Sequence, residues 1–295
     1  MSQQVRACPV CGSASWRAFC VHRDVQFVRC RSCASIYQAL PLDPVRLQAL
    51  YGESYHEIRG HSKNPAIEAA KRATTRRYLR MLQRYPDDTG KPRRLLEVGC
   101  SAGAGLAAAV ECGWEAEGVE ISAPAADTAR HRPGVRAVYC GRVQDLPLPA
   151  ARYDAVVLFD VIEHIDPPQP TLAALHRLLV PGGVLLMVTP DAGSFSARMM
   201  GAAWVHLFIE HVILFSRRAL RQALESAGFS VECAGFAWKR VNLDMLVRHA
   251  TIHSHIMFGG ALRMAGRVLP AALLRAMLPF NIGEFYMLAR RPEGS

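Results

Sequence analysis

From Arg94 onward, short apolar segments alternate with segments of helical periodicity. The strand-like segments are rich in Leu, Val and Phe, and they cover residues 95–98, 115–119, 135–139, 153–159, 184–189, 229–237 and 284–290. The helical patterns between them cover residues 106–112, 123–130, 170–179 and 216–227. Strands that alternate with helices predict an α/β fold, with a doubly wound, mostly parallel, seven-stranded sheet covered by helices on both faces.

The first strand runs into a glycine-rich turn, Glu97-Val98-Gly99-Cys100-Ser101-Ala102-Gly103-Ala104-Gly105. Such a turn between a strand and a helix lets a ligand approach the backbone closely, and by itself it would also suit a nicotinamide dinucleotide. Two further features favour another cofactor. Glu120 ends the second strand, where its carboxylate can accept hydrogen bonds from ribose hydroxyls, and Asp160-Val161-Ile162-Glu163-His164 follows the fourth strand.

In these motifs the sequence resembles the class I S-adenosylmethionine-dependent methyltransferases, over nearly half of the chain. Residues 96–103 match the cofactor loop, 118–122 the ribose-binding strand end, 153–165 the active-site rim and 178–183 the approach to strand five. The stretch 204–216 is similar to a subgroup that works on small molecules, sugars and lipid-linked glycans. Some members of that group begin with a four-cysteine zinc module and a Tyr-x-x-x-Tyr stretch, here Tyr51 to Tyr55.

The resemblance implies an S-adenosylmethionine site at the carboxyl edge of the sheet. It implicates Glu97, Gly99, Cys100, Ser101, Gly103, Glu120, Ile121, Val143, Gln144 and Asp160. The sequence departs from the family pattern at two positions. Ser101 replaces a glycine of the loop, and Arg142 stands where relatives place an acidic residue near the adenine amino group. We therefore expect the adenine to contact the Val143 backbone, Gln144 or Asp145 instead.

Methyl transfer from a sulfonium is an in-line displacement at carbon, so the protein positions the reactants and controls the acceptor's proton. An oxygen acceptor needs a general base, which near pH 7 is usually histidine. We predict His164 and His211 as candidates, and Asp160 as a contact of the cofactor's methionine end or of the acceptor. A structural role is an equal alternative for each histidine: Glu163-His164 can order its loop, and His211 can pair with Glu210 or with backbone.

Four of the nine cysteines form two CxxC pairs, and 18 residues separate Cys8-Pro-Val-Cys11 from Cys30-Arg-Ser-Cys33. This spacing predicts a zinc ribbon whose four thiolates form the tetrahedral set that Zn²⁺ prefers. Residues 16–28 would form a short hairpin between the two pairs. We predict a structural zinc rather than a catalytic one, because four thiolates leave no open position for water. Cys20 is not an expected ligand, and the remaining cysteines suit small core positions.

These patterns divide the chain into a zinc-ribbon-like module at residues 1–40, a helical linker at 41–93 and a methyltransferase domain at 94–295. The linker is expected to contain helices at 45–51 and 66–85, the second with a basic face between Lys71 and Arg80. Before the last strand, residues 241–282 predict a helical cap. Its apolar and basic composition also suits an amphipathic lid on a membrane surface or on a lipid-linked acceptor.

The formal charge of +10 is unevenly distributed. Residues 1–95 hold 17 basic and 7 acidic side chains, residues 96–235 hold 10 and 15, and residues 236–295 hold 8 and 3. The basic flanks favour an anionic acceptor, or one presented at an anionic surface. Neither a signal peptide nor an apolar run of membrane-spanning length occurs, which favours a cytoplasmic protein with at most peripheral membrane contact.

We therefore expect an S-adenosylmethionine-dependent methyltransferase that acts on a small-molecule, sugar or lipid-linked glycan acceptor by O-methylation. One alternative is an RNA methyltransferase that grips phosphates with the zinc module and the basic helix at 71–80. That alternative is weaker, because the region lacks the interleaved aromatic residues that stack bases. A second alternative is a non-catalytic binding or scaffold protein that retains the fold, which the departures at Ser101 and Arg142 would permit.

Overall fold

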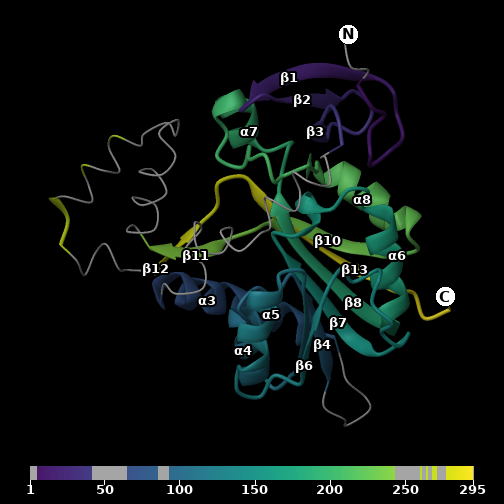
Figure 1. Ribbon diagram of the computed structural model, residues 1–295, viewed down its shortest axis with the longest axis vertical. Coiled ribbons are helices and arrows are strands. Elements are labelled where there is room, and N and C mark those ends of the chain that lie inside the picture. Colours follow the sequence, from purple (N-terminus) through teal and green to yellow (C-terminus); the bar gives the residue numbers. More distant parts are fainter. Residues whose placement is uncertain are drawn as a thin grey trace.

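The computed structural model describes residues 5–41, 65–85, 93–242, 260, 264, 268–270 and 277–294. The predicted helix at 45–51, the Tyr51 to Tyr55 stretch and most of the predicted cap lie outside the described residues. A central sheet forms the body of the protein, with helices on its faces and the N-terminal module over one end (Figure 1). Within the described ranges, no helix combines the length and hydropathy needed to cross a membrane.

The central sheet has seven strands in the order β10-β13-β8-β7-β4-β5-β6, which confirms the predicted fold class. Their bounds are β4 Arg94–Val98, β5 Glu115–Glu120, β6 Ala137–Cys140, β7 Tyr153–Phe159, β8 Leu179–Pro190, β10 Ser230–Phe236 and β13 Glu284–Arg290. Strands β4 to β8 pair in parallel, whereas β13 runs antiparallel to both of its neighbours. The strand order reverses between β4 and β7, where open α/β sheets bind their ligands.

Helices cover both faces of this sheet (Figure 1). The helices are α3 Pro65–Leu82, α4 Ala104–Glu111, α5 Ala123–Arg130, α6 Gln169–Leu178 and α8 Arg217–Ser226. Because side chains alternate along a strand, Leu95 of β4 packs with α3, α4 and α5, while Leu96 packs with α6 and α8 on the other face. Both leucines are fully buried.

Local signals set the ends of α8. The Ser216 hydroxyl accepts a hydrogen bond from the Ala219 amide at 3.1 Å, so Ser216 is the N-cap that its sequence position predicts. Gly228 follows the helix with a φ of 92°, a left-handed conformation that glycine adopts without steric cost. These two residues start and stop the helix where the sequence pattern places them.

The N-terminal module contains the strands β1 Trp16–His22, β2 Val25–Cys30 and β3 Ile36–Gln38. The expected hairpin between the cysteine pairs is β1–β2. A feature that the sequence did not indicate is β9 (Ile213–Leu214), which pairs with β3 as the fourth strand of this sheet. Because β9 belongs to the connection between β8 and α8, the domain contributes one strand to the module's sheet, which is separate from the central sheet.

The segment predicted as a helical cap begins and ends with strands. Strand β11 (Lys239–Asn242) pairs antiparallel with β12 (Met277–Phe280), while the described residues 260, 264 and 268 between them are helical, so the helical cap over the whole of 241–282 stays a prediction. Pro279 is one reason for a strand rather than a helix at β12, because proline cannot continue a helix interior. The Arg240 amide also donates to Thr74 Oγ1 of α3 at 2.9 Å, which holds β11 against that helix.

Candidate active site

The glycine-rich turn after β4 adopts backbone conformations that suit glycine. Gly99 and Gly103 have φ values of 75° and 79°, and a Cβ on Gly99 would lie 2.3 Å from Val161 Cγ2. At Ser101 the family pattern has glycine. Its φ is 49°, a left-handed conformation that few of the described non-glycine residues adopt. Ser101 therefore holds a left-handed backbone conformation that carries local strain.

Glu120, at the end of β5, fixes this loop. Its Oε2 accepts from the Ser101 amide at 2.8 Å, and its Oε1 accepts from the Ser122 amide at 2.9 Å. The side chain is buried. Each carboxylate oxygen has a second lone-pair direction, so the same group can still accept from a ribose. Glu120 thus connects the turn after β4 with the turn before α5.

Glu97 lies at the end of β4, buried with no hydrogen-bond partner for Oε2 among the described residues. Burial raises its pKa to about 8. Gly105 leaves the space for this carboxyl group, because a Cβ there would lie 2.2 Å from Glu97 Oε1. Lys71 of α3 adds a positive charge: burial lowers its pKa, and the charges of Glu97, Asp160 and Glu120 oppose that shift.

The other predicted cofactor residues lie at the ends of β5 and β6. The Ile121 side chain is 45 % exposed, and Val143 is buried. Gln144 Oε1 accepts from Thr171 Oγ1 at 3.0 Å, so this amide is already oriented. Cys100 is buried against Gly118, whose added Cβ would lie 2.7 Å from Cys100 Sγ. Its thiol also donates to the Ser101 carbonyl at 3.8 Å, within the loop itself.

Asp160 belongs to a charged network that the sequence did not reveal. Lys239 Nζ lies 2.6 Å from Asp160 Oδ2 and 2.5 Å from Glu284 Oε1. Burial raises the pKa of Glu284 to about 7, whereas the Lys239 ammonium outweighs burial at Asp160 and holds its pKa below the usual value. His206 Nε2 lies 3.7 Å from Glu284 Oε1. Asp160 is therefore a partner of Lys239, and its φ of 55° marks a strained position after β7.

The two predicted catalytic histidines meet although 46 residues separate them along the chain. Their rings form a T-shaped pair with centroids 4.7 Å apart. His164 Nδ1 lies 2.9 Å from the Glu210 carbonyl oxygen, and His211 Nδ1 lies 2.7 Å from the His206 carbonyl oxygen. A carbonyl oxygen can only accept, so both Nδ1 atoms donate, and in the neutral form of each imidazole Nε2 carries the lone pair.

Glu163 completes this cluster. Glu163, His164 and His211 place ligand atoms within 4.8 Å of one another, a set that could hold a metal ion. Glu163 Oε2 accepts from Thr189 Oγ1 at 2.9 Å, while its buried Oε1 has no hydrogen-bond partner in the described part of the chain. Burial raises the pKa of Glu163 to about 8. The cluster can therefore exchange a proton or bind a cation.

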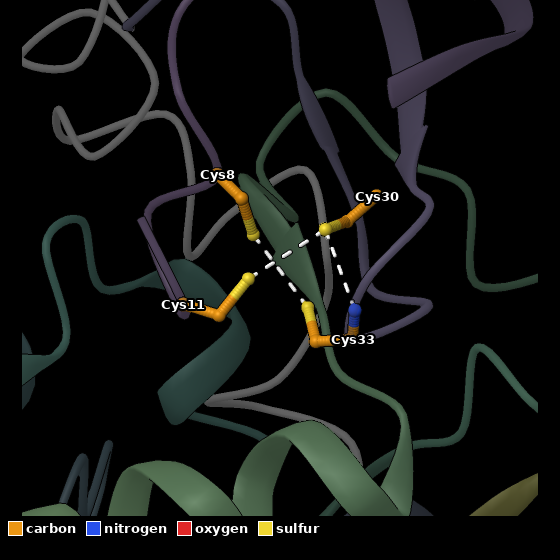
Figure 2. A group of neighbouring side chains, drawn as sticks. All are labelled: Cys8, Cys11, Cys30 and Cys33. Carbon is orange, nitrogen blue, oxygen red and sulfur yellow. Dashed lines mark hydrogen bonds between the residues drawn. The ribbon is translucent and has the colours of Figure 1, made fainter. Parts of the chain in front are cut away.

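The four predicted metal ligands form the second cluster. Figure 2 shows the sulfur atoms of Cys8, Cys11, Cys30 and Cys33 pointing toward one another. Cys8 Sγ lies 3.6 Å from Cys33 Sγ, and Cys11 Sγ lies 3.6 Å from Cys30 Sγ. A tetrahedral zinc with Zn–S bonds of about 2.3 Å places its sulfur atoms about 3.8 Å apart, so this set fits such an ion.

The module contacts the segments that carry the histidines. Ser216 Oγ donates to the Cys33 carbonyl at 2.6 Å, and Gln38 Nε2 donates to the Ile209 carbonyl at 2.6 Å. Arg6 Nη1 lies 2.5 Å from Asp166 Oδ2 in the loop after β7. The N-terminal module therefore contacts the chain segments on which His164 and His211 lie.

Comparison with known proteins supports a common origin for the domain. A family model described as a methyltransferase domain matches residues 69–234, more than half of the chain. A probable S-adenosylmethionine-dependent methyltransferase of Mycolicibacterium smegmatis is 32% identical over 140 residues, which cover 48% of this chain and 53% of that protein. A ubiquinone biosynthesis O-methyltransferase of Cereibacter sphaeroides is 30% identical over 177 residues, which cover 54% of this chain and 72% of that protein. The chain thus spans about half the length of the first of these relatives.

Solved structures share the fold at low sequence identity. A putative methyltransferase of Bacillus halodurans has a TM-score of 0.53 at 19% identity, over 72% of this chain and 98% of that chain. The 1,6-didemethyltoxoflavin-N1-methyltransferase of Burkholderia thailandensis, solved with S-adenosylhomocysteine, has a TM-score of 0.52 at 18% identity, over 95% and 100%. These similarities concern the architecture of the chain.

Proposed function

The chain belongs to the S-adenosylmethionine-dependent methyltransferase family, and we propose that it methylates an oxygen of a small-molecule, sugar or lipid-linked glycan acceptor. The observation that carries the proposal is the His164–His211 pair beyond the end of β7, with both imidazoles oriented by backbone carbonyls. A histidine with a basic Nε2 is the group that an oxygen acceptor requires near pH 7. Two relatives named as O-methyltransferases agree with this chemistry.

In the proposed reaction, Glu120 would hold the ribose of S-adenosylmethionine, and the glycine-rich turn would accommodate its methionine end. Once bound, the cofactor would supply an electrophilic methyl group. One histidine would accept the proton of the acceptor hydroxyl at Nε2. Asp160 and Lys239 form a fixed ion pair beside this path. We assign to that pair the positioning of the methionine end or of the acceptor.

We further propose that the four cysteines hold a structural zinc ion. Their separations support this assignment, and four thiolates leave no position for a reacting water. In this proposal, the metal keeps the module rigid against the segment that carries His211. Its contribution to methyl transfer is therefore positional.

The first test is calorimetric titration of the full chain with S-adenosylmethionine. We expect binding in the micromolar range for the wild type. Glu120→Gln should bind at least about tenfold more weakly, because its amide group cannot accept from both backbone N–H groups and a ribose. The matched control is Glu115→Gln at the opposite end of β5, which should leave the affinity unchanged. Absence of wild-type binding up to millimolar cofactor would favour the scaffold alternative.

A second test separates catalysis from structure at the histidines. With an acceptor identified from a panel of hydroxylated compounds, His164→Gln or His211→Gln should lower kcat by about 10²–10⁴ if that residue is the base. The same variant should also lose the acidic limb of the pH–rate profile, which a purely structural histidine would retain. If added divalent cations restore wild-type activity lost to a chelator, the cluster acts through a metal instead.

The RNA alternative loses part of its support in this fold. Two arginines of the predicted basic face, Arg72 and Arg76, contact Glu111 of α4. Lys71, on the same helix, is close enough to Glu97 and Asp160 for their charges to raise its pKa. Only the rest of that face remains for phosphates. RNA binding by the wild type that weakens steeply with salt would restore the alternative.

A further inference from the structure

A cavity lies on the N-terminal module, beside Cys30 of the four-cysteine cluster. Its volume is about 730 Å³, and it lies between the β1–β2 hairpin and α7 (Phe195–Met200). In Figure 1, α7 lies beside the module, over the end of the central sheet. The described residues that line the cavity include no Asp or Glu. They are the metal-ligand candidate Cys30, small or apolar residues, and four arginines: Arg17, Arg29, Arg31 and Arg198.

The fold assembles these positive charges against their mutual repulsion. Arg17 and Arg29 are directly opposite one another in the β1–β2 register, where like charges destabilise a strand pair. The carboxylate of Asp191, next to Ala192, is already engaged, because its Oδ2 accepts from Arg217 Nε at 2.8 Å. A bound anion would relieve this repulsion.

The Arg29 guanidinium is held in place before any ligand binds. Its Nη1 donates to the Ala192 carbonyl at 3.0 Å and to the Ala34 carbonyl at 3.3 Å, and the group lies 5.2 Å from the centre of the Phe19 ring. Both hydrogen bonds use Nη1, so the donors on Nε and Nη2 can serve a ligand. A fixed guanidinium loses little conformational entropy on binding, and its geometry matches two oxygens of a phosphate.

We propose that this pocket binds the phosphate group of a ligand, as a phosphate ester or a diphosphate. Four arginines without a lining carboxylate suit two or more negative charges, and the cavity has room for such a group. The pocket also lies next to two segments of the methyltransferase domain. Ala192 follows the end of β8, and Arg198 precedes the segment that carries His211. The proposal extends the proposed function, but phosphate binding needs no turnover and can be tested separately.

The surface next to Arg198 is apolar. Phe195 and Met199, three residues before and one residue after Arg198, are 79% and 63% exposed. On a helix, Phe195 is a neighbour of Arg198, three residues on, and of Met199, four residues on, so Met199 extends the apolar surface through Phe195. A phosphate at this place could therefore belong to a lipid headgroup, with apolar chains against Phe195 and Met199, or to a water-soluble ester.

The test uses the full-length, metal-loaded protein and two probes. Calorimetry with inorganic pyrophosphate at low salt should give micromolar-to-millimolar binding. Arg198→Gln should weaken it at least about tenfold, as the loss of a charge-assisted bond predicts. Arg198 is exposed and makes no ion pair among the described residues, so this variant keeps the fold. Arg218→Gln on α8 removes an exposed charge elsewhere and should bind as the wild type does.

The second probe is flotation with vesicles of phosphatidylcholine, with and without phosphatidic acid. Pyrophosphate binding without flotation identifies a water-soluble phosphate ester as the ligand class. Flotation that needs phosphatidic acid and is lost in Arg198→Gln identifies a lipid headgroup. The proposal is overturned if the wild type binds neither probe, or if Arg218→Gln weakens binding as much as Arg198→Gln does.

Discussion

The Ser216 hydroxyl joins the four-cysteine module to the methyltransferase domain. It donates to the Cys33 carbonyl at 2.6 Å and accepts from the Ala219 amide at 3.1 Å, and both Ser216 and Cys33 are buried. Ser216→Ala removes both bonds. Loss of an N-cap costs about 1 kcal/mol, and a buried carbonyl left without a donor costs about 1–3 kcal/mol. The variant should therefore be about 2–4 kcal/mol less stable than the wild type.

Urea unfolding of the metal-loaded protein measures this difference. Far-UV circular dichroism follows the domain, and a chromogenic chelator follows release of metal from the module. The unfolding midpoint should fall in Ser216→Ala while the denaturant slope stays constant. Metal release should move to lower urea together with the loss of helix, because one hydroxyl supports both parts.

Ser194→Ala is the matched control. Ser194 caps α7 through a 3.1 Å bond from the Ala197 amide, but makes no bond to the module among the described residues. It should cost only about 1 kcal/mol and leave metal release unchanged. If Ser216→Ala were no more destabilising than Ser194→Ala, the bond to Cys33 would contribute nothing and the reasoning would fail.

Three further predictions concern the buried Glu97, the four-cysteine cluster and the glycine-rich turn. Burial raises the pKa of Glu97 to about 8, so its carboxyl is neutral when folded but ionised when unfolded between about pH 5 and 8. Without cofactor, the unfolding free energy of the wild type should therefore fall as pH rises from about 5 to 8. In Glu97→Gln this fall should be smaller by on the order of 3 kcal/mol, and urea unfolding at both pH values measures the difference. Cys11→Ser should lose bound metal in elemental analysis, whereas Cys20→Ser should retain it; equal metal content would exclude the four-cysteine site. Gly99→Ala should lower both Tm and cofactor affinity, because its Cβ would lie 2.3 Å from Val161 Cγ2; unchanged values would show that the loop tolerates a side chain.

Features encoded in a few neighbouring residues were predictable. The strand–turn–helix pattern around Gly99 and the cap at Ser216 depend on short-range sequence, and both appear where expected. The cysteine pairs were also readable, because each CxxC turn is local and the spacing between pairs is typical of zinc ribbons. The central sheet followed from the regular alternation of strand and helix patterns.

Contacts between distant residues could not be predicted in this way. Lys239 meets Asp160 and Glu284 across 79 and 45 positions, and no local pattern relates them. The sequence predicted His164 and His211 as separate candidates for the general base. Only the fold shows that their rings are in contact. Besides Asp160, the sequence offered one weak signal of the charged network, namely Glu284, an acidic residue at the start of a strand in a basic segment.

The pairing of β3 with β9 also affects how the chain folds during synthesis. Ile36 pairs with Leu214, and about 175 residues separate them, a stretch that a ribosome takes roughly 10–35 s to make at 5–20 residues per second. Throughout that interval β3 has an open edge able to pair with other chains. Metal binding early in synthesis can order the two CxxC turns, but the edge of β3 stays unpaired until β9 has been synthesised. The nascent module therefore stays exposed to mispairing at the edge of β3 until residue 214 emerges, and chaperone demand at this edge should end there.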